Sequence, residues 1–214
     1  MRITDLLDER AIRLNSLAST KEESINQMIN LISQTGNIVN KQEFKETVFK
    51  REKEGTTGIG EGIAIPHGKS RVVKKTCLSA MVLPKGVEFE SLDGKKVNLM
   101  FLIAAPENQE NTHLEVLSRL SALLMDEKFR ENLKKAKTPA EFRNIINEAE
   151  QAKYGEEKVV DQIISETFKA EIIQKAQEGE YEILCITSCP TGIAHTYMAA
   201  EALEKAGTEM KHSI

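Results

Sequence analysis

Residues 58–69 read Gly-Ile-Gly-Glu-Gly-Ile-Ala-Ile-Pro-His-Gly-Lys and are the first segment with a recognisable chemical pattern. Its four glycines permit positive φ angles and let the backbone approach a ligand or a partner closely. Pro66 stiffens the chain before His67, so we expect a loop that holds an imidazole at the surface among exposed amides. A phosphoryl acceptor needs a neutral ring nitrogen with hydrogen-bond donors around it. The residues alone leave open that His67 only caps a turn.

Amphipathic helices are expected on both sides of this segment. Residues 20–36 open with a capping box at Thr20 and continue with apolar residues at helical spacing. A second helix is expected over about residues 41–54, with Phe44 and Val48 on its buried side. Later in the chain, residues 114–124 repeat the helical spacing, with leucines at 114, 117, 120 and 124 on the apolar side.

Strands are expected between these helices. Residues 77–83 and 97–104 are short apolar segments bounded by turn signals, among them Pro84-Lys85-Gly86. A last helix opens at Thr138-Pro139. Interleaved helices and strands predict an α/β fold in which helices flank a mixed β-sheet.

The character of the sequence changes after residue 150. Residues 151–180 are highly charged with sparse apolar pairs, which favours a helical connector. Residues 181–187 then predict a buried strand, and a loop leads into a helix over 195–205. A strand and one helix cannot close a core, so 181–214 is expected to be an incomplete unit. The predicted organisation is therefore 1–150, 151–180 and 181–214.

Charge and composition exclude several classes of protein. The net charge of −4 argues against a dedicated nucleic-acid binder. No apolar run is long enough for a transmembrane helix, and the N-terminus lacks a signal-peptide core, so a cytoplasmic protein is expected. The three cysteines suit reduced thiols better than disulfides or a zinc site. We expect neither a metal nor a cofactor.

Two further residues are candidates for the histidine site. Arg51, in the last turn of the second helix, offers a planar fork that matches phosphate oxygens, although a solvated charge is the plainer interpretation. His113 lies at the start of a predicted helix, where free amides favour anions. It could contact a phosphoryl group or be a simple helix-start histidine.

A second chemical segment surrounds Cys189. The sulfur follows a predicted strand and precedes a helix, where the helix dipole and loop amides lower a thiol's pKa and can hold a phosphate. Cys77 and Cys185 lie within predicted strands and are expected in the core. The spacing also suggests low-molecular-weight tyrosine phosphatases, but His195 stands at the position of their arginine. The loss of that bidentate group would disable hydrolysis and still permit a phosphate carrier.

Residues 58–68 strongly resemble the active-site loop of the fructose/mannitol-type (type 2) EIIA domains of the phosphotransferase system, with likeness over about 1–150. The stretch from Cys189 to Thr196 resembles the phosphocysteine loop of fructose-type EIIB domains. These resemblances imply that His67 accepts phosphate from phospho-HPr, that Arg51 and His113 assist, and that Cys189 or its equivalent in an EIIB domain receives the group next.

The implied activity is a phosphotransferase in sugar uptake, with fructose favoured. The implied partners are phospho-HPr, an EIIB domain and a membrane EIIC domain, through which the chain would associate with the inner face of the membrane. The alternative is a nitrogen-type regulatory EIIA module that uses the same histidine for signalling. The sequence leaves open the sugar, the ring nitrogen that is phosphorylated and the oligomeric state.

Overall fold

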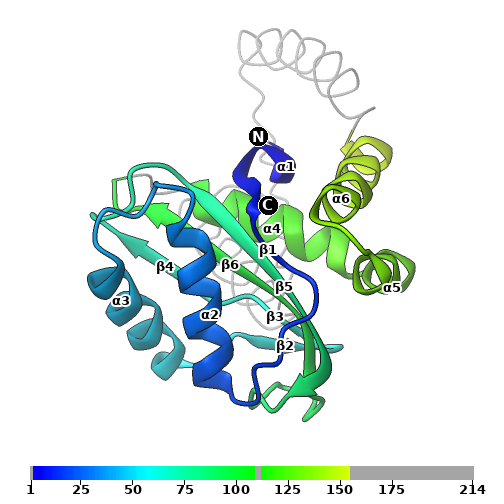
Figure 1. Ribbon diagram of the computed structural model, residues 1–214, viewed down its shortest axis with the longest axis horizontal. Helices are drawn as coiled ribbons and strands as arrows, with labels where there is room; N and C mark the ends of the chain where they lie inside the picture. Colours follow the sequence, from blue (N-terminus) through cyan, green and yellow to red (C-terminus); the bar gives the residue numbers. More distant parts are fainter. Residues whose placement is uncertain (1, 109–111, 155–214) are drawn as a thin grey trace, which may run out of the picture. The chain divides into compact units, whose positions relative to one another are not determined.

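Six strands and six helices make up the part of the chain that a computed structural model describes, residues 2–108 and 112–154 (Figure 1). The strands are β1 (Leu7–Arg13), β2 (Gly58–Gly60), β3 (Ile63–Ala64), β4 (His67–Ser70), β5 (Cys77–Val87) and β6 (Val97–Pro106). The helices are α1 (Ile3–Leu6), α2 (Lys21–Ser33), α3 (Lys41–Glu54), α4 (Thr112–Leu124), α5 (Glu127–Lys135) and α6 (Pro139–Tyr154). Residues 1–150 form one compact unit.

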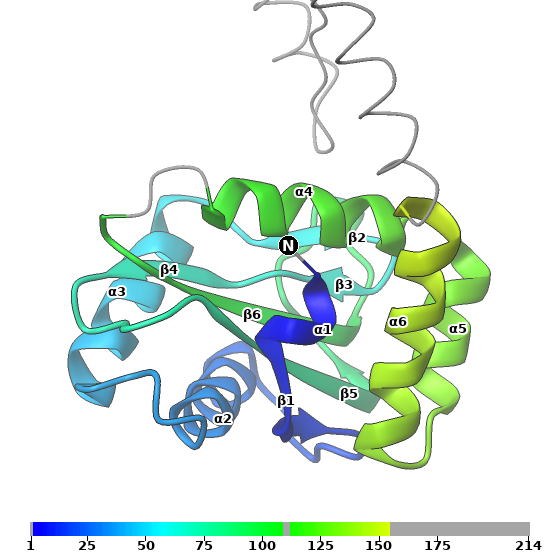
Figure 2. The ribbon, with the colours of Figure 1, turned by 90° about the horizontal axis from the view of Figure 1, so that it is seen from above.

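The sheet is mixed and its order is β1-β5-β6-β3-β2, with β4 also paired to β6. Strands β5 and β6 are antiparallel, whereas β1 pairs with β5 and both β3 and β4 pair with β6 in parallel. In Figure 1, α2 and α3 lie in front of the sheet and α4 lies behind it; Figure 2 turns the same layers edge-on. The expected mixed sheet flanked by helices is confirmed.

The core lies on both faces of the two long central strands. From Leu99 to Ala105, every side chain of β6 is at most 1% exposed, as the continuous apolar run of a strand covered on both faces requires. The face covered by α2 and α3 receives Phe44 and Val48 of α3. Elsewhere, the rings of Phe101 and Phe142 join β6 to α6 with their centroids 6.0 Å apart.

Helices α2 and α6 begin at the capping residues that the sequence predicted. The hydroxyl of Thr20 accepts a hydrogen bond from the Glu23 amide at 3.1 Å, and that of Thr138 accepts one from the Glu141 amide at 3.1 Å. Because these side chains satisfy amides that a helix leaves unpaired, they fix where α2 and α6 begin. Helix α3 has the predicted bounds, 41–54.

The structure corrects several expectations. Strand β1 and helix α5 were missed, because their short apolar patterns are broken by charged side chains. Strand β5 continues through residues 84–86, where its register with β6 shifts, so Pro84-Lys85-Gly86 does not end it. Leu114 is 55% exposed, because α4 instead buries Val116, Leu120 and Leu123.

The glycine-rich segment is also not the loop that was expected. Residues 58–70 contain β2, β3 and β4, so many of their amides bond to neighbouring strands. Positive φ angles are confined here to the turn from Gly60 to Gly62, which includes Glu61 at φ 53°. The strand character comes from the pairing of β3 and β4 with β6 and of β2 with β3, and not from an alternation of buried isoleucines, since Gly58 and Gly60 of β2 are buried whereas Ile59 is half-buried.

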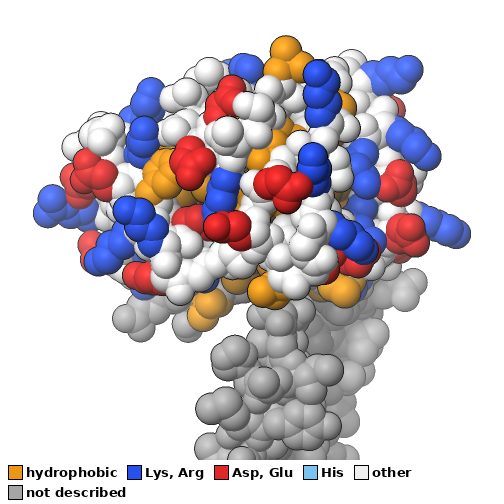
Figure 3. Space-filling view, turned by 90° about the horizontal axis from the view of Figure 1, so that it is seen from below, with side chains coloured by type: hydrophobic (Ala, Val, Ile, Leu, Met, Phe, Trp, Pro, Cys, Tyr) orange, Lys and Arg blue, Asp and Glu red, His pale blue; other side chains and the backbone are white. Residues whose placement is uncertain are grey.

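The surface carries charges of both signs. On the face shown in Figure 3, basic and acidic side chains lie side by side, and they leave no broad area of one sign. Ion pairs such as Lys95–Glu61 at 2.9 Å and Lys21–Glu90 at 2.8 Å follow the same pattern. Among the described helices, none combines the length and apolar character needed to cross a membrane.

The end of α3 is held by a buried carboxylate. Glu52, 7% exposed, accepts hydrogen bonds from the amide and the hydroxyl of Thr57 and lies 2.9 Å from the ammonium of Lys21. Burial of the ammonium opposes its charge, but hydrogen bonds to Glu90 and Glu52 raise the pKa of Lys21. Glu52 therefore ties the last turn of α3 to the start of α2 and to the segment that enters β2.

We expect Glu52→Ala to lower the free energy of unfolding by about 1–3 kcal/mol, because the buried Thr57 amide loses its acceptor. The matched control is Glu54→Ala, which removes an exposed carboxylate from the same helix end. Urea unfolding monitored by circular dichroism measures both variants. Equal midpoints for the two would contradict a structural role for Glu52.

Candidate functional site

His67 is the first residue of β4 and lies at half-buried depth. Its strand runs parallel to β6, with His67 opposite Ile103, and the Ile103 amide donates to the Pro66 carbonyl at 3.0 Å. Strand β3 pairs with an earlier part of β6, so Ile65 and Pro66 form the break between two short strands on one partner. The imidazole is therefore carried by a paired strand, which restricts its position more than a loop would.

The contact of one ring nitrogen determines where the proton of His67 resides. Nδ1 lies 3.0 Å from the carbonyl oxygen of Ile65. A carbonyl only accepts hydrogen bonds, so Nδ1 carries the proton in this contact and the lone pair of the neutral ring is on Nε2. The backbone thus selects the nitrogen that can act as a nucleophile.

Arg51 lies at this second nitrogen. Its Nε donates to Nε2 of His67 at 3.1 Å, and its Nη1 donates to the carbonyl of Gly55 at 3.1 Å. The Gly55 contact is formed just beyond the end of α3 and holds the guanidinium across the helix terminus. The structure thus brings Arg51 and His67 together, two residues that the sequence assigns to one candidate site.

The other two predicted site residues are placed only in part or not at all. His113 is the second residue of α4, in the first helical turn as expected, and its side chain lies outside the described part of the structure. Cys189 and the whole region of residues 155–214 lie outside the described residues, together with Cys185 and His195. In the described part of the chain, no cluster of three or more His, Cys, Asp or Glu side chains is arranged to hold a metal ion.

Comparison with known proteins identifies the family. Residues 5–149 match a family model described as "Phosphoenolpyruvate-dependent sugar phosphotransferase system, EIIA 2". The chain belongs to this EIIA type 2 family. Residues 184–214 match a second model, described as "PTS system, Lactose/Cellobiose specific IIB subunit". The chain therefore combines an EIIA type 2 segment, residues 5–149, with a fragment of a IIB subunit.

A curated relative extends this likeness beyond the EIIA segment. The PTS system fructose-specific EIIABC component of Bacillus subtilis (strain 168) is 41% identical over 210 residues, 98% of this chain and 31% of that protein. The chain spans less than a third of the length of the first curated EIIABC relatives it matches.

Solved structures confirm the fold of the EIIA segment. The crystal structure of the nitrogen regulatory protein IIA-Ntr from Neisseria meningitidis is 33% identical with a TM-score of 0.64, and the match covers 67% of this chain and 98% of that one. The complex of enzyme IIAMTL and phosphorylated enzyme IIBMTL from Escherichia coli is 29% identical with a TM-score of 0.58, and covers 66% of this chain and 99% of that one.

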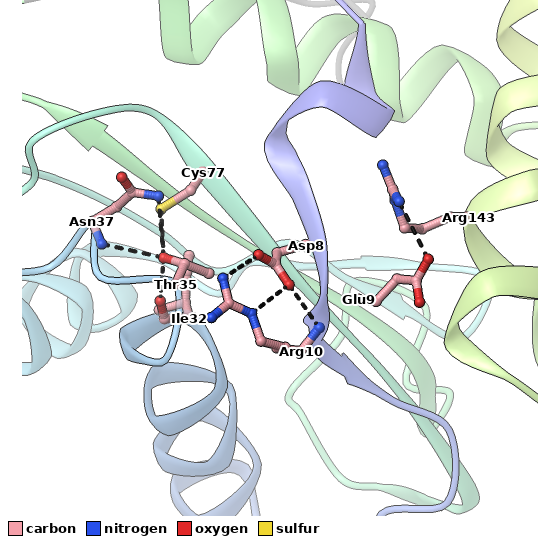
Figure 4. Close-up of polar contacts among 8 residues, drawn as sticks. All are labelled: Asp8, Glu9, Arg10, Ile32, Thr35, Asn37, Cys77 and Arg143. Carbon is pink, nitrogen blue, oxygen red and sulfur yellow. Dashed lines mark hydrogen bonds and ion pairs between the residues drawn. The ribbon is translucent and has the colours of Figure 1, made fainter.

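A separate cavity of about 410 Å³ lies along β1 and next to Cys77. Figure 4 shows the charged groups there in pairs: Asp8 with Arg10, and Glu9 with Arg143. Hydrogen bonds from Arg10 lower the pKa of Asp8 to about 2, so this carboxylate stays ionised at neutral pH. Among the described residues, Nε of Arg143 is buried without a hydrogen-bond partner, so the pairing of these charges is incomplete, and the cavity contains neither Arg51 nor His67.

Cys77 is a core residue, as the sequence predicted. Its side chain is 2% exposed, and its sulfur lies 4.0 Å from the hydroxyl of Thr35, which in turn donates to the carbonyl of Ile32 (Figure 4). Burial raises the pKa of this thiol to about 11, so the thiolate is scarce at neutral pH.

We therefore expect Cys77 to resist iodoacetamide at pH 8 in the folded protein and to react fully in urea, where its pKa returns toward that of a free thiol. Peptide mass mapping after timed alkylation distinguishes Cys77 from the other cysteines. Rapid alkylation of Cys77 without denaturant would contradict its buried, protonated state.

Proposed function

We propose that the EIIA segment accepts a phosphoryl group from phospho-HPr on Nε2 of His67. One observation carries this proposal: the Ile65 carbonyl directs the lone pair to Nε2, the same nitrogen that Arg51 contacts at 3.1 Å. A phosphoryl acceptor requires both features at one atom, a neutral nucleophile and a cation for the oxygens of the arriving group.

The proposed step is an in-line displacement. The lone pair of Nε2 forms a bond to the phosphorus, the bond from phosphorus to the histidine nitrogen of HPr breaks, and its electron pair returns to that nitrogen. Nδ1 keeps its proton throughout, and the Ile65 carbonyl stabilises the positive charge that develops on the phosphorylated ring. Catalysis then rests on position and charge, without a metal or cofactor contributed by this chain.

Arg51 and His113 are the proposed partners of the phosphoryl group. When the group arrives, the Arg51 guanidinium moves its hydrogen bonds from Nε2 to the phosphoryl oxygens, which its planar fork can bind in pairs. His113 is proposed to reach the same group from the first turn of α4, where unpaired amides also favour an anion.

The proposed acceptor from His67 is a cysteine of a IIB domain, either Cys189 or its equivalent in an intact partner. The cysteine thiolate attacks the phosphorus and the electron pair of the broken bond returns to Nε2. We propose residues 1–150 as the EIIA domain, 151–180 as a connector and 181–214 as the N-terminal part of an EIIB domain. The connector would raise the effective concentration of one module near the other.

The proposed biological role is sugar uptake at the cytoplasmic face of a membrane, with an EIIC domain as the transporting partner. Fructose is the proposed sugar, because a relative that is 41% identical over 98% of this chain is named for fructose; a second relative, 34% identical over 98% of this chain, is named for 2-O-alpha-mannosyl-D-glycerate. A nitrogen-regulatory role is the second candidate, supported by the likeness of the EIIA segment to the Neisseria protein. The IIB match at 184–214 favours transport, because a pure sensor needs no downstream acceptor.

The direct test is phosphoryl uptake from phosphoenolpyruvate through Enzyme I and HPr. We expect labelled phosphate to appear on the wild-type chain and to be absent from His67→Ala, because this variant removes the ring nitrogen that Arg51 contacts. Mass spectrometry of the labelled peptide under alkaline conditions, where phosphohistidine persists, locates the group.

The matched control is Cys189→Ser, which removes the proposed downstream thiol and should label as fast as the wild type. Addition of an intact IIB domain should then discharge the label. Uptake by His67→Ala at a normal rate would overturn the site assignment. Uptake on His67 without discharge to any IIB domain would favour the regulatory role.

The role of Arg51 predicts a graded loss. We expect Arg51→Ala to slow phosphoryl uptake by about 10²-fold or more, since one donor to a developing anion contributes on that order. Arg51→Lys should recover only part of the rate, because an ammonium cannot bind two oxygens in one plane. Rapid-quench measurements give the rates, and Lys50→Ala, an exposed neighbour on α3, is the control. Full activity in Arg51→Lys would show that charge alone suffices.

A further inference from the structure

Gly68, the residue after His67, lies in very close contact with α3. A Cβ atom at this position would lie 2.9 Å from Cγ2 of Val48 and 3.0 Å from Cε2 of Phe44. Both of these side chains are fully buried, with at most 1% exposure, and belong to the core between α3 and the sheet. There is therefore no room for any side chain at residue 68 unless the helix or its core residues move.

The reason for glycine here is space and not backbone conformation. Gly36, Gly60, Gly62, Gly86 and Gly94 have positive φ angles, whereas Gly68 lies in the paired strand β4 without one. Any residue could adopt the backbone of a parallel strand. Only glycine, which has no Cβ atom, allows α3 to lie this close to β4.

The same two elements carry the functional pair. Val48 and Arg51 are three residues apart in α3 and lie on neighbouring positions of its surface. His67 and Gly68 are consecutive in β4. A change in the spacing between Val48 and Gly68 therefore changes the distance between Arg51 and His67, which is 3.1 Å. Hydrogen bonds between nitrogen atoms weaken within a few tenths of an ångström beyond that length.

We propose that Gly68 is a positioning residue for phosphoryl transfer: its missing side chain lets α3 lie on β4 at the spacing that holds Arg51 at Nε2 of His67. This inference rests on the proposed function and adds a residue to it. Gly68 does not touch the phosphoryl group. It acts through Val48 and Phe44 on the helix that carries Arg51.

The decisive variant is Gly68→Ala, measured as the rate of phosphoryl uptake from phospho-HPr by the full chain. We expect a loss of roughly 10- to 100-fold, the range for a reacting group displaced by about 1 Å. The Arg51 Nε–H signal in nitrogen-15 NMR should change, whereas the Nδ1-protonated form of His67 should persist, because its Ile65 partner lies outside the contact.

Rescue separates positioning from general damage. Val48→Ala removes Cγ2, the nearer of the two atoms that the new Cβ would meet, and leaves the 3.0 Å approach to Cε2 of Phe44. A shift of the Phe44 ring by a few tenths of an ångström relieves that approach, so Val48→Ala/Gly68→Ala should fold and regain uptake to within about threefold of Val48→Ala alone. In an Arg51→Ala background, Gly68→Ala should slow uptake by less than about twofold, because residues that act through one contact are not additive.

The control for stability is Ile146→Ala, which removes a fully buried side chain from α6, at the opposite end of the sheet from α3 in Figures 1 and 2. It should lower the unfolding midpoint and leave the rate of uptake unchanged. Folded Gly68→Ala with a normal rate would overturn the inference while the loss of label in His67→Ala keeps the proposed function. If Gly68→Ala does not fold, the inference is overturned when the folded Val48→Ala/Gly68→Ala variant takes up phosphate more slowly than Val48→Ala alone by well over that margin of about threefold.

Discussion

The structure of the site depends on two hydrogen bonds at opposite sides of one imidazole. The Ile65 carbonyl accepts a hydrogen bond from Nδ1, and the Arg51 guanidinium donates one to Nε2. The two hydrogen bonds require the same tautomer. A proton on Nε2 would face the donor of Arg51, and an unprotonated Nδ1 would face the carbonyl oxygen of Ile65. The pair therefore selects one neutral tautomer and one ring orientation before any partner arrives.

That arrangement is built from elements distant in the sequence. Strand β4 fixes the ring because it pairs with β6, and α3 fixes the guanidinium because its last turn is tied down by Glu52. Gly68 sets the distance between the two elements. Nε2 of His67 is thus positioned by the pairing of β4 with β6, by the end of α3 and by the close contact at Gly68. Together these leave the half-buried imidazole little freedom.

The sequence predicted the four longest helices, the two long central strands and both members of this pair, but not α1, α5 or β1 to β4, and not how the pair meets. Capping residues such as Thr20 and Thr138 act within one turn, so they can be read from neighbouring positions. The pairing of β4 with β6 is a long-range contact without a local signal. For this reason the glycines of residues 58–68 suggested a loop, although the segment contains three short paired strands. The Ile65 carbonyl is a backbone group, so its hydrogen bond to His67 cannot be predicted from the type of side chain at residue 65.

The resting contact between Arg51 and Nε2 raises the question of how a nucleophile can work while a donor occupies its lone pair. The bond is between a cation and a neutral acceptor, and phosphoryl oxygens are far better partners for a guanidinium than an imidazole nitrogen is. In the proposed transfer, the arriving anion therefore draws the guanidinium away and uncovers Nε2 at the moment when the phosphorus is in reach. In this proposal the guanidinium therefore covers Nε2 at rest and binds the phosphoryl oxygens during transfer.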